Sequence, residues 1–218
     1  MAALKLVIGN KNYSSWSMRP WLALRANDIA FDEVFIPLYT DNKADKDRIL
    51  SFTPSGKVPV LIDGDVTVWD SLAIIEYLAD KFPEKQLWPR QPAARAHARA
   101  ISAEMHSGFV ALRSECGMNL HRPVGAVALS DDARANIARV QDIWAECYRR
   151  YGGPFLFGGF GAADAMYAPV VHRFRTYAIE LAPAARPYFD AMSSLPAFQQ
   201  WTSDGLAETL VIARFEAV

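Results

Sequence analysis

The sequence PSGKVPVLIDGDVTVWDSLAIIEYL, residues 54–78, decides the fold that we expect for this chain. Two short apolar runs flank Asp63-Gly64, a dipeptide typical of tight hairpin turns because glycine readily adopts positive φ. Asp70 and Ser71 favour the N-cap of a helix, and the residues that follow carry apolar side chains at helical spacing. The stretch therefore predicts a β-hairpin that leads directly into an amphipathic helix.

The same stretch has two features that bear on ligand binding. Pro59 has no backbone N–H and suits the start of a strand, and a cis bond before it would turn the N–H and C=O of Val58 outward. One outward donor and one outward acceptor are what an extended peptide needs for strand-like pairing. Asp70 and Ser71 lie at a helix N-terminus, which attracts anions. A small anionic peptide is the expected ligand, and an ordinary capped hairpin-helix is the alternative.

These residues resemble the N-terminal domain of the glutathione transferase family, which has a thioredoxin-like fold. The resemblance implies that Val58, followed by a cis Pro59, pairs with the cysteinyl backbone of glutathione. It also implies that Asp70 and Ser71 hold the γ-glutamyl group, although Asp70 is shorter than the Glu or Gln often found there. Lys57 is expected beside the glycyl carboxylate, or else is a surface lysine without a role.

Composition and charge exclude several classes of protein. The chain has 218 residues, a formal net charge of −1 and 51% hydrophobic residues, which is ordinary for a globular protein. No basic excess points to nucleic acid, and no apolar run reaches membrane-spanning length. Cys116 and Cys147 have no metal-binding spacing, so we expect reduced thiols, no metal and a cytoplasmic protein without a signal peptide.

The order of the expected elements predicts two domains. Residues 1–82 read β-α-β-α-β-β-α, residues 83–92 form a proline-rich linker, and residues 93–218 carry almost no strand signal. We expect an α/β thioredoxin-like N-terminal domain followed by an all-α C-terminal helical domain that contributes the electrophile pocket, which is the plan of the glutathione transferases. The expected strands and helices before the linker are 4–8, 16–26, 31–38, 41–50, 60–62, 66–68 and a helix from Asp70-Ser71; the later helices are 93–116, 131–151, 162–179, 183–192 and 196–202.

A helix-start signature of the same family falls on residues 160–164. The family has a capping box there, with Ser or Thr followed by Asp at the third helical position. Gly161 replaces the hydroxyl residue in this chain, so half of the box is missing. We expect Asp164 to accept the free N–H groups of the helix and to have a structural role.

The candidate catalytic residues lie in SSWSMRPWLAL, residues 14–24. A hydroxyl at a helix start can donate a hydrogen bond to a thiolate, which the helix dipole also favours. The segment resembles the zeta-class motif SSCSxRxRxAL, and Ser14 falls on the activating serine with Ser15 beside it. Trp16 replaces the cysteine and Pro20-Trp21 replaces the second basic residue, which makes zeta-type isomerisation less favoured. Helix capping alone is the alternative for the serines.

Other residues are weaker candidates. Tyr13 is a competing hydroxyl, because some transferase classes use an early tyrosine. The second-substrate pocket should lie between the domains, with four candidate lining residues on the helix after the linker: Met105, His106, Phe109 and Arg113. Arg173 and Arg175 either bind an anionic substrate or pair with Glu180, and the sequence does not choose between these roles.

The resemblance implies an enzyme that conjugates the glutathione thiolate to mainly apolar electrophiles. One alternative is a glutathione-dependent cis-trans isomerase of the zeta, or maleylacetoacetate isomerase, type. The other is a non-catalytic protein that uses the fold for binding or stress response. Glutathione is the expected co-substrate and a homodimer the expected assembly, as is usual in the family, with no nucleic acid or membrane partner.

Overall fold

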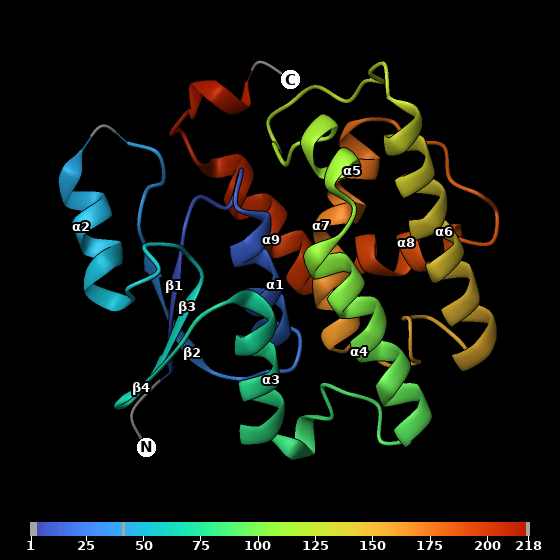
Figure 1. Cartoon of the computed structure of the whole chain (residues 1–218), viewed down its shortest axis with the longest axis horizontal. Helices are drawn as coiled ribbons and strands as arrows, with labels where there is room; N and C mark the ends of the chain where they lie inside the picture. The colour runs from blue at the N-terminus through green and yellow to red at the C-terminus, as the bar shows by residue number, and fades with distance from the viewer. Residues whose placement is uncertain (1–3, 41, 217–218) are drawn as a thin grey trace.

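The structure is a computed structural model that describes residues 4–40 and 42–216, and it begins with a four-stranded mixed sheet (Figure 1). The sheet has the strand order β2-β1-β3-β4, in which β1 runs parallel to β2 and antiparallel to β3. The predicted hairpin is confirmed, because β3 and β4 pair antiparallel with Ile62 opposite Thr67. The strands are β1 Leu4–Ile8, β2 Phe31–Phe35, β3 Val60–Asp63 and β4 Val66–Val68.

Helices cover the sheet and form the rest of the described chain. The first three α-helices belong to the module that contains the sheet: α1 Ser15–Arg25, α2 Lys43–Phe52 and α3 Ser71–Lys81. A 3₁₀ turn, η1 Pro83–Lys85, leads to the helical region: α4 Pro92–Ser107, α5 Val110–Glu115, α6 Asp131–Tyr151, α7 Ala162–Thr176, α8 Arg186–Ser194, α9 Pro196–Ala207 and the 3₁₀ turn η2 Ala213–Phe215. No helix among the described residues is both long and apolar enough to cross a membrane.

The central strands of the sheet contribute buried side chains to both faces. Side chains alternate along a strand, so Leu6 and Ile8 of β1 enter the large core with α1 and α3, whereas Val7 points to the other face. There Val7 packs with Val60 and with Ile49 of α2. Figure 1 shows α2 on one side of the sheet and α1 with α3 on the other. The expected thioredoxin-like α/β module is confirmed.

The helical region is held to the α/β module by α7. This helix packs against α1 and α4, and nearly all of its side chains are buried. Asp164 accepts hydrogen bonds from the backbone N–H groups of Leu156 and Gly161, at 3.0 and 2.8 Å, as the capping signature predicts. Burial nevertheless raises the pKa of this carboxyl to about 7. The predicted all-helical second part of the chain is confirmed.

The predicted single helix over residues 93–116 is wrong. The chain leaves the helix at Gly108 and resumes as α5 at Val110, with Phe109 in the left-handed region at φ +55°. A Cβ on Gly108 would lie 2.7 Å from the carbonyl oxygen of Glu104, so only glycine fits this turn. Apolar spacing continues across the break, which is why the sequence pattern does not reveal it.

Several predicted boundaries also differ from the observed ones. β2 ends at Phe35 rather than residue 38, and α1 spans Ser15–Arg25 rather than residues 16–26. α7 ends at Thr176, α8 begins at Arg186, and α9 extends to Ala207. The start of the helix predicted from residue 41 lies partly outside the described residues, and α2 begins at Lys43.

Candidate active site

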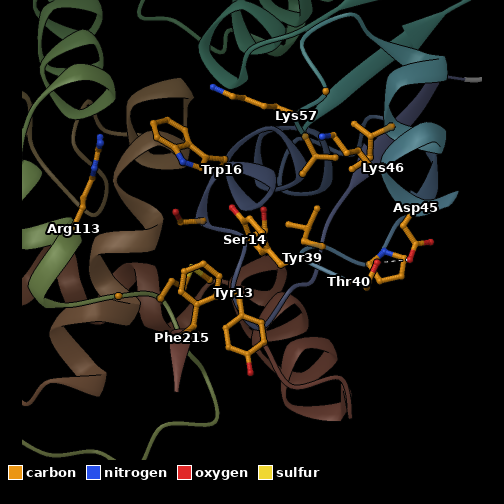
Figure 2. A pocket seen from close by; sticks show the side chains of 18 of the residues that line it. Tyr13, Ser14, Trp16, Tyr39, Thr40, Asp45, Lys46, Lys57, Arg113 and Phe215 are labelled. Carbon is orange, nitrogen blue, oxygen red and sulfur yellow. Dashed lines mark hydrogen bonds between the residues drawn. The ribbon is translucent and has the colours of Figure 1, made fainter. Parts of the chain in front are cut away.

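A cavity of about 730 Å³ opens beside the N-terminus of α1, between the α/β module and the helical region (Figure 2). Trp16 and Arg113 lie on one side, and Lys46 lies on the other. Its lining comes from both parts of the fold: Tyr13, Ser14, Ser15, Trp16, Pro37, Leu38, Tyr39, Thr40, Asp45, Lys46, Ile49, Gly56, Lys57, Val58, Arg113, Gly117, Met118, Arg173 and Phe215.

Ser14 is the N-cap of α1. Its hydroxyl oxygen accepts a hydrogen bond from the backbone N–H of Ser17 at 3.3 Å, and its hydroxyl lies 2.8 Å from Ser17 Oγ. Ser17 Oγ in turn accepts a hydrogen bond from the N–H of Gly9 at the end of β1. Ser14 therefore caps the helix and also lines the cavity, so the cap does not remove the side chain from the cavity.

Ser15, the first residue of α1, faces the cavity beside a buried cation. Arg173 of α7 places Nη2 3.5 Å from Ser15 Oγ and donates from Nε to the carbonyl oxygen of Cys116 at 2.8 Å. Both side chains are more than nine-tenths buried. Of the two roles left open for Arg173, pairing with Glu180 is not observed among the described residues, and the side chain lines the cavity instead.

Tyr13 directs its hydroxyl away from Ser14, as Figure 2 shows. The hydroxyl donates to Glu216 Oε1 at 2.5 Å and accepts from the N–H of Ile212. Its ring stacks on Phe215, with centroids 5.6 Å apart. Burial raises the pKa of Tyr13, and the bond to Glu216 raises it further. Tyr13 thus holds the segment 212–216 beside the cavity through two hydrogen bonds and a ring contact.

A smaller cavity of about 350 Å³ adjoins the first one. The residues expected to bind glutathione gather there; the lining consists of Trp16, Ser55, Lys57, Val58, Pro59, Trp69, Asp70 and Ser71. The Val58–Pro59 peptide bond is cis. Asp70 caps α3 by accepting the N–H of Leu72 at 2.8 Å, and Ser71 Oγ is buried without a hydrogen-bond partner. Trp16, Lys57 and Val58 line both cavities, so one ligand can extend from the smaller cavity into the larger one.

Three guanidinium groups lie at the larger cavity or against Trp16, which lines it. Arg113 and Arg173 line it, and the Arg19 guanidinium lies 4.1 Å from the centre of the Trp16 ring. Arg113 approaches the same ring at 5.3 Å. Arg19 Nε and Nη1 and Arg173 Nη1 are buried without a hydrogen-bond partner, and none of the ion pairs among the described residues includes any of the three. Arg19 and Arg173 are buried and form no ion pair among the described residues, although the charge of Asp70 raises the pKa of Arg19. Such an excess of buried cations indicates a site that receives an anion.

Burial changes the acidity of these arginines. Desolvation, followed by repulsion from Arg173 and Arg113, lowers the pKa of Arg19 to about 9. Desolvation also lowers the pKa of Arg173 to about 10 and lowers that of Arg113. With pKa values of about 9 and 10, Arg19 and Arg173 remain cationic near neutral pH.

The candidates predicted for the electrophile pocket separate in the structure. Arg113 lines the large cavity, whereas Met105 is fully buried in the core and Phe109 is 7% exposed at the break between α4 and α5. His106 lies beside the smaller cavity, where Nε2 is 3.2 Å from Asp70 Oδ2. Among these four, only Arg113 reaches the larger cavity.

Sequence reasoning missed several residues that shape the site. Trp16 lines both cavities, and Tyr39 and Phe215 contact each other in the lining of the larger one, with centroids 5.5 Å apart. Phe215 comes from the last described turn of the chain, and no local pattern links it to the N-terminal loop. Among the sequence patterns described above, only the serine motif of residues 14–24 includes Arg19. No group of three or more His, Cys, Asp or Glu residues in the described chain is placed to hold a metal.

Two family models match the chain. The N-terminal domain model of glutathione S-transferase matches residues 13–81, and the C-terminal domain model of glutathione S-transferase matches residues 93–202. Together they account for well over half of the sequence.

Individual relatives point the same way. The chain is 30% identical over 186 residues to maleylacetoacetate isomerase from Rattus norvegicus, covering 84% of each chain. It is 28% identical over 206 residues to glutathione S-transferase Z2 from Arabidopsis thaliana, covering 87% of this chain and 88% of that protein. A glutathione transferase homologue from Burkholderia gl BGR1, solved with bound glutathione, is 20% identical and shares the fold with a TM-score of 0.71, covering 95% of this chain and 100% of that one.

Proposed function

Because the chain belongs to the glutathione transferase family, we propose that it activates the glutathione thiol at the N-terminus of α1 and directs the thiolate at a small electrophile in the larger cavity. The observation that carries this proposal is the position of Ser14 and Ser15. Both hydroxyls face the larger cavity at a helix N-terminus, and the smaller cavity with its peptide-binding features adjoins it.

In this proposal glutathione lies across both cavities. Val58 offers its backbone next to the cis Pro59, and Lys57 borders both cavities and supplies a cation for a carboxylate. Ser71 at the start of α3 has a buried hydroxyl without a partner, which a γ-glutamyl carboxylate would satisfy. Asp70 provides the negative charge for the amino group. The thiol then lies at the start of α1.

The site has the means to ionise that thiol. A free cysteine thiol has a pKa of about 8.5, and lowering it by about two units requires roughly 2.7 kcal/mol. A hydroxyl hydrogen bond to a charged sulfur contributes about 1.5–3 kcal/mol, and a helix terminus contributes about 0.3–1 kcal/mol more. Arg173, next to Ser15, adds positive charge in a desolvated setting. No protein nucleophile is required, because the peptide supplies the sulfur.

The charge of the cavity favours an electrophile that carries an acidic group. Trp16, Met118 and Phe215 provide apolar walls, whereas Arg113 and Arg173 provide cations without counter-charges in the described chain. We therefore extend the expectation of a mainly apolar electrophile: the substrate has an apolar or aromatic body and a carboxylate or similar anion. The thiolate attacks its electrophilic carbon and forms the C–S bond, and the leaving group departs with its electron pair.

The second candidate function is glutathione-dependent isomerisation of the zeta type, and one observation favours it. Trp21, which replaces the second basic residue of the zeta motif, is fully buried, donates to Glu33 at 2.7 Å and packs on Trp201 of α9. Its side chain does not line the cavity, so this departure leaves the site unchanged. Trp16 is then the departure that matters. An isomerase would return a rearranged dicarboxylic substrate without a stable conjugate.

A non-catalytic binding or stress protein is the remaining alternative from a different class. We infer a cytoplasmic homodimer from the family, to be checked by light scattering of the purified chain. Protein that binds glutathione yet neither conjugates nor isomerises any tested compound would support the non-catalytic function.

The proposal is tested by binding and turnover on the same protein. Calorimetry should show glutathione binding, and assays should show conjugation to a chlorodinitrobenzene and a chlorodinitrobenzoate, with the carboxylated compound preferred. The double variant Ser14→Ala/Ser15→Ala should retain glutathione binding and lose at least about tenfold in kcat, which corresponds to about 1.4 kcal/mol. Absence of glutathione binding by the unmodified chain would refute the proposal.

A further inference from the structure

Asp70 is held by a side chain from the other part of the fold. Its Oδ1 caps α3, and its Oδ2 lies 3.2 Å from Nε2 of His106, near the end of α4. Asp70 lines the smaller cavity and His106 does not. The two carboxylate oxygens therefore have different partners, one local and one from the helical region.

His106 is itself held in place. Its ring lies edge-on to Trp16, with centroids 5.3 Å apart, and its backbone carbonyl accepts a hydrogen bond from Arg113 Nη1 at 3.1 Å. Its Nδ1 is buried without a hydrogen-bond partner, so the contact with Asp70 is the polar interaction seen for this imidazole in the described chain. The ring is thus aimed at Asp70 by packing on one side and by its backbone on the other.

We propose that His106 is a positioning residue for recognition of the ligand's amino group, an inference that rests on the proposed glutathione site. Asp70 is short and its side chain is 46% exposed, and the bond from the Leu72 N–H engages Oδ1 only. His106 restricts the carboxylate to the orientation in which its remaining lone pairs face the smaller cavity. An ionised carboxylate accepts several hydrogen bonds, so Asp70 can bond His106 and an ammonium group together.

This role differs from that of an electrophile-pocket residue. It predicts that His106 affects the affinity for glutathione through the γ-glutamyl amino group and leaves the bound thiol unaffected. The contact with Asp70 also connects α4 to the smaller cavity, and the backbone carbonyl of His106 on that helix accepts the hydrogen bond from Arg113.

The test compares glutathione with an analogue whose γ-glutamyl residue is replaced by glutaryl and therefore lacks the amino group. Calorimetry gives the ratio of the two dissociation constants for the unmodified chain and for His106→Phe, which keeps a ring against Trp16 but removes the donor to Asp70. His106→Gln restores a side-chain donor, and Asp70→Asn removes the charge. His97→Phe is the matched control, because His97 lies on the same helix and contacts Tyr151 instead.

His106→Phe is expected to reduce the preference for glutathione over the analogue by about five- to tenfold, which is about 1–1.4 kcal/mol. His106→Gln should recover part of that loss, and His97→Phe should show the full preference. In the background of Asp70→Asn, the His106→Phe change should have little further effect, because the two residues act together. The kcat at saturating glutathione should be unchanged.

Equal weakening of glutathione and the analogue by His106→Phe would overturn the inference, since a general structural defect would affect both. His106→Phe with the same dissociation constants for both ligands as the unmodified chain would overturn it as well. Either result, with glutathione still bound by the unmodified chain, leaves the proposed function intact; failure of the unmodified chain to bind glutathione refutes the proposed function itself.

Discussion

At the scale of single residues, charge distinguishes this site. Arg19 and Arg113 lie over the Trp16 ring and Arg173 lies beside Ser15, and these three cations from three helices form no ion pair among the described residues. Burying a cation without a partner costs several kcal/mol, so such a cluster is retained only where something compensates it. A thiolate and an acidic substrate group supply the compensating negative charges in our account.

The cluster leads to a prediction about substrate preference. Arg113→Gln should lower kcat/KM for a chlorodinitrobenzoate by about tenfold, because a hydrogen bond to a charged group contributes about 1.5–3 kcal/mol and part of it is screened near the opening of the cavity. Steady-state assays with a neutral chlorodinitrobenzene should change less than about twofold. Arg175→Gln is the control, because Arg175 lies over Phe198 and does not line the cavity. Equal losses on both substrates would contradict the assignment.

At the scale of elements, the sequence predicted best where local chemistry acts alone. The hairpin β3–β4 and the cap at Asp70 follow from turn and capping preferences that need no distant partner. The break between α4 and α5 depends on the close approach of Gly108 to a carbonyl, and the contribution of Phe215 depends on a C-terminal segment that returns to the N-terminal loop. Such contacts are set by tertiary packing and have no local signature.

Gly161 shows how tertiary packing overrides a helix-capping preference. A Cβ at this N-cap would lie 2.7 Å from the backbone carbonyl oxygen of Leu87, and that oxygen accepts a hydrogen bond from Ala162 N–H at 2.8 Å. The linker segment therefore occupies the space that a serine or threonine would need, and Asp164 alone completes the cap.

Restoring the family's hydroxyl should consequently destabilise the protein. Gly161→Ser is expected to lower the free energy of unfolding by about 1–3 kcal/mol, as overpacking typically does, although serine is ordinarily the better N-cap. Urea denaturation measures the change. Gly159→Ser is a suitable comparison, because a Cβ there would meet no atom within 4 Å. A larger free energy of unfolding for Gly161→Ser would show that the Leu87 carbonyl does not crowd a side chain at residue 161.

At the scale of the whole molecule, α7 packs α1 against the helical region, and a buried histidine makes that packing sensitive to pH. His172 stacks on Phe198 of α9 with centroids 4.1 Å apart and lies 3.3 Å from Thr202 Oγ1. Desolvation, reinforced by Arg175 and Arg173, lowers its pKa to about 3. The imidazole therefore stays neutral in the folded protein.

The sign of the resulting pH dependence follows from proton binding. Below its ordinary pKa of about 6.5, the imidazole binds a proton in the unfolded chain but not in the folded one, so stability is full above that pH and falls towards pH 3. This group alone should remove about 2 kcal/mol of the free energy of unfolding near pH 5. Urea denaturation near pH 7.5 and near pH 5 should show the loss, and His172→Phe should reduce it. An undiminished loss in that variant would assign the pH dependence to other groups.

The central claim is that the N-terminus of α1 ionises a bound thiol, and the most direct measurement is the thiolate absorbance of glutathione bound to the protein, titrated against pH. We predict a pKa about two units below the free-thiol value of about 8.5 for the unmodified chain, returning towards that value in Ser14→Ala/Ser15→Ala. Bound glutathione that ionises with the pKa of the free peptide, in the unmodified protein, would contradict the account.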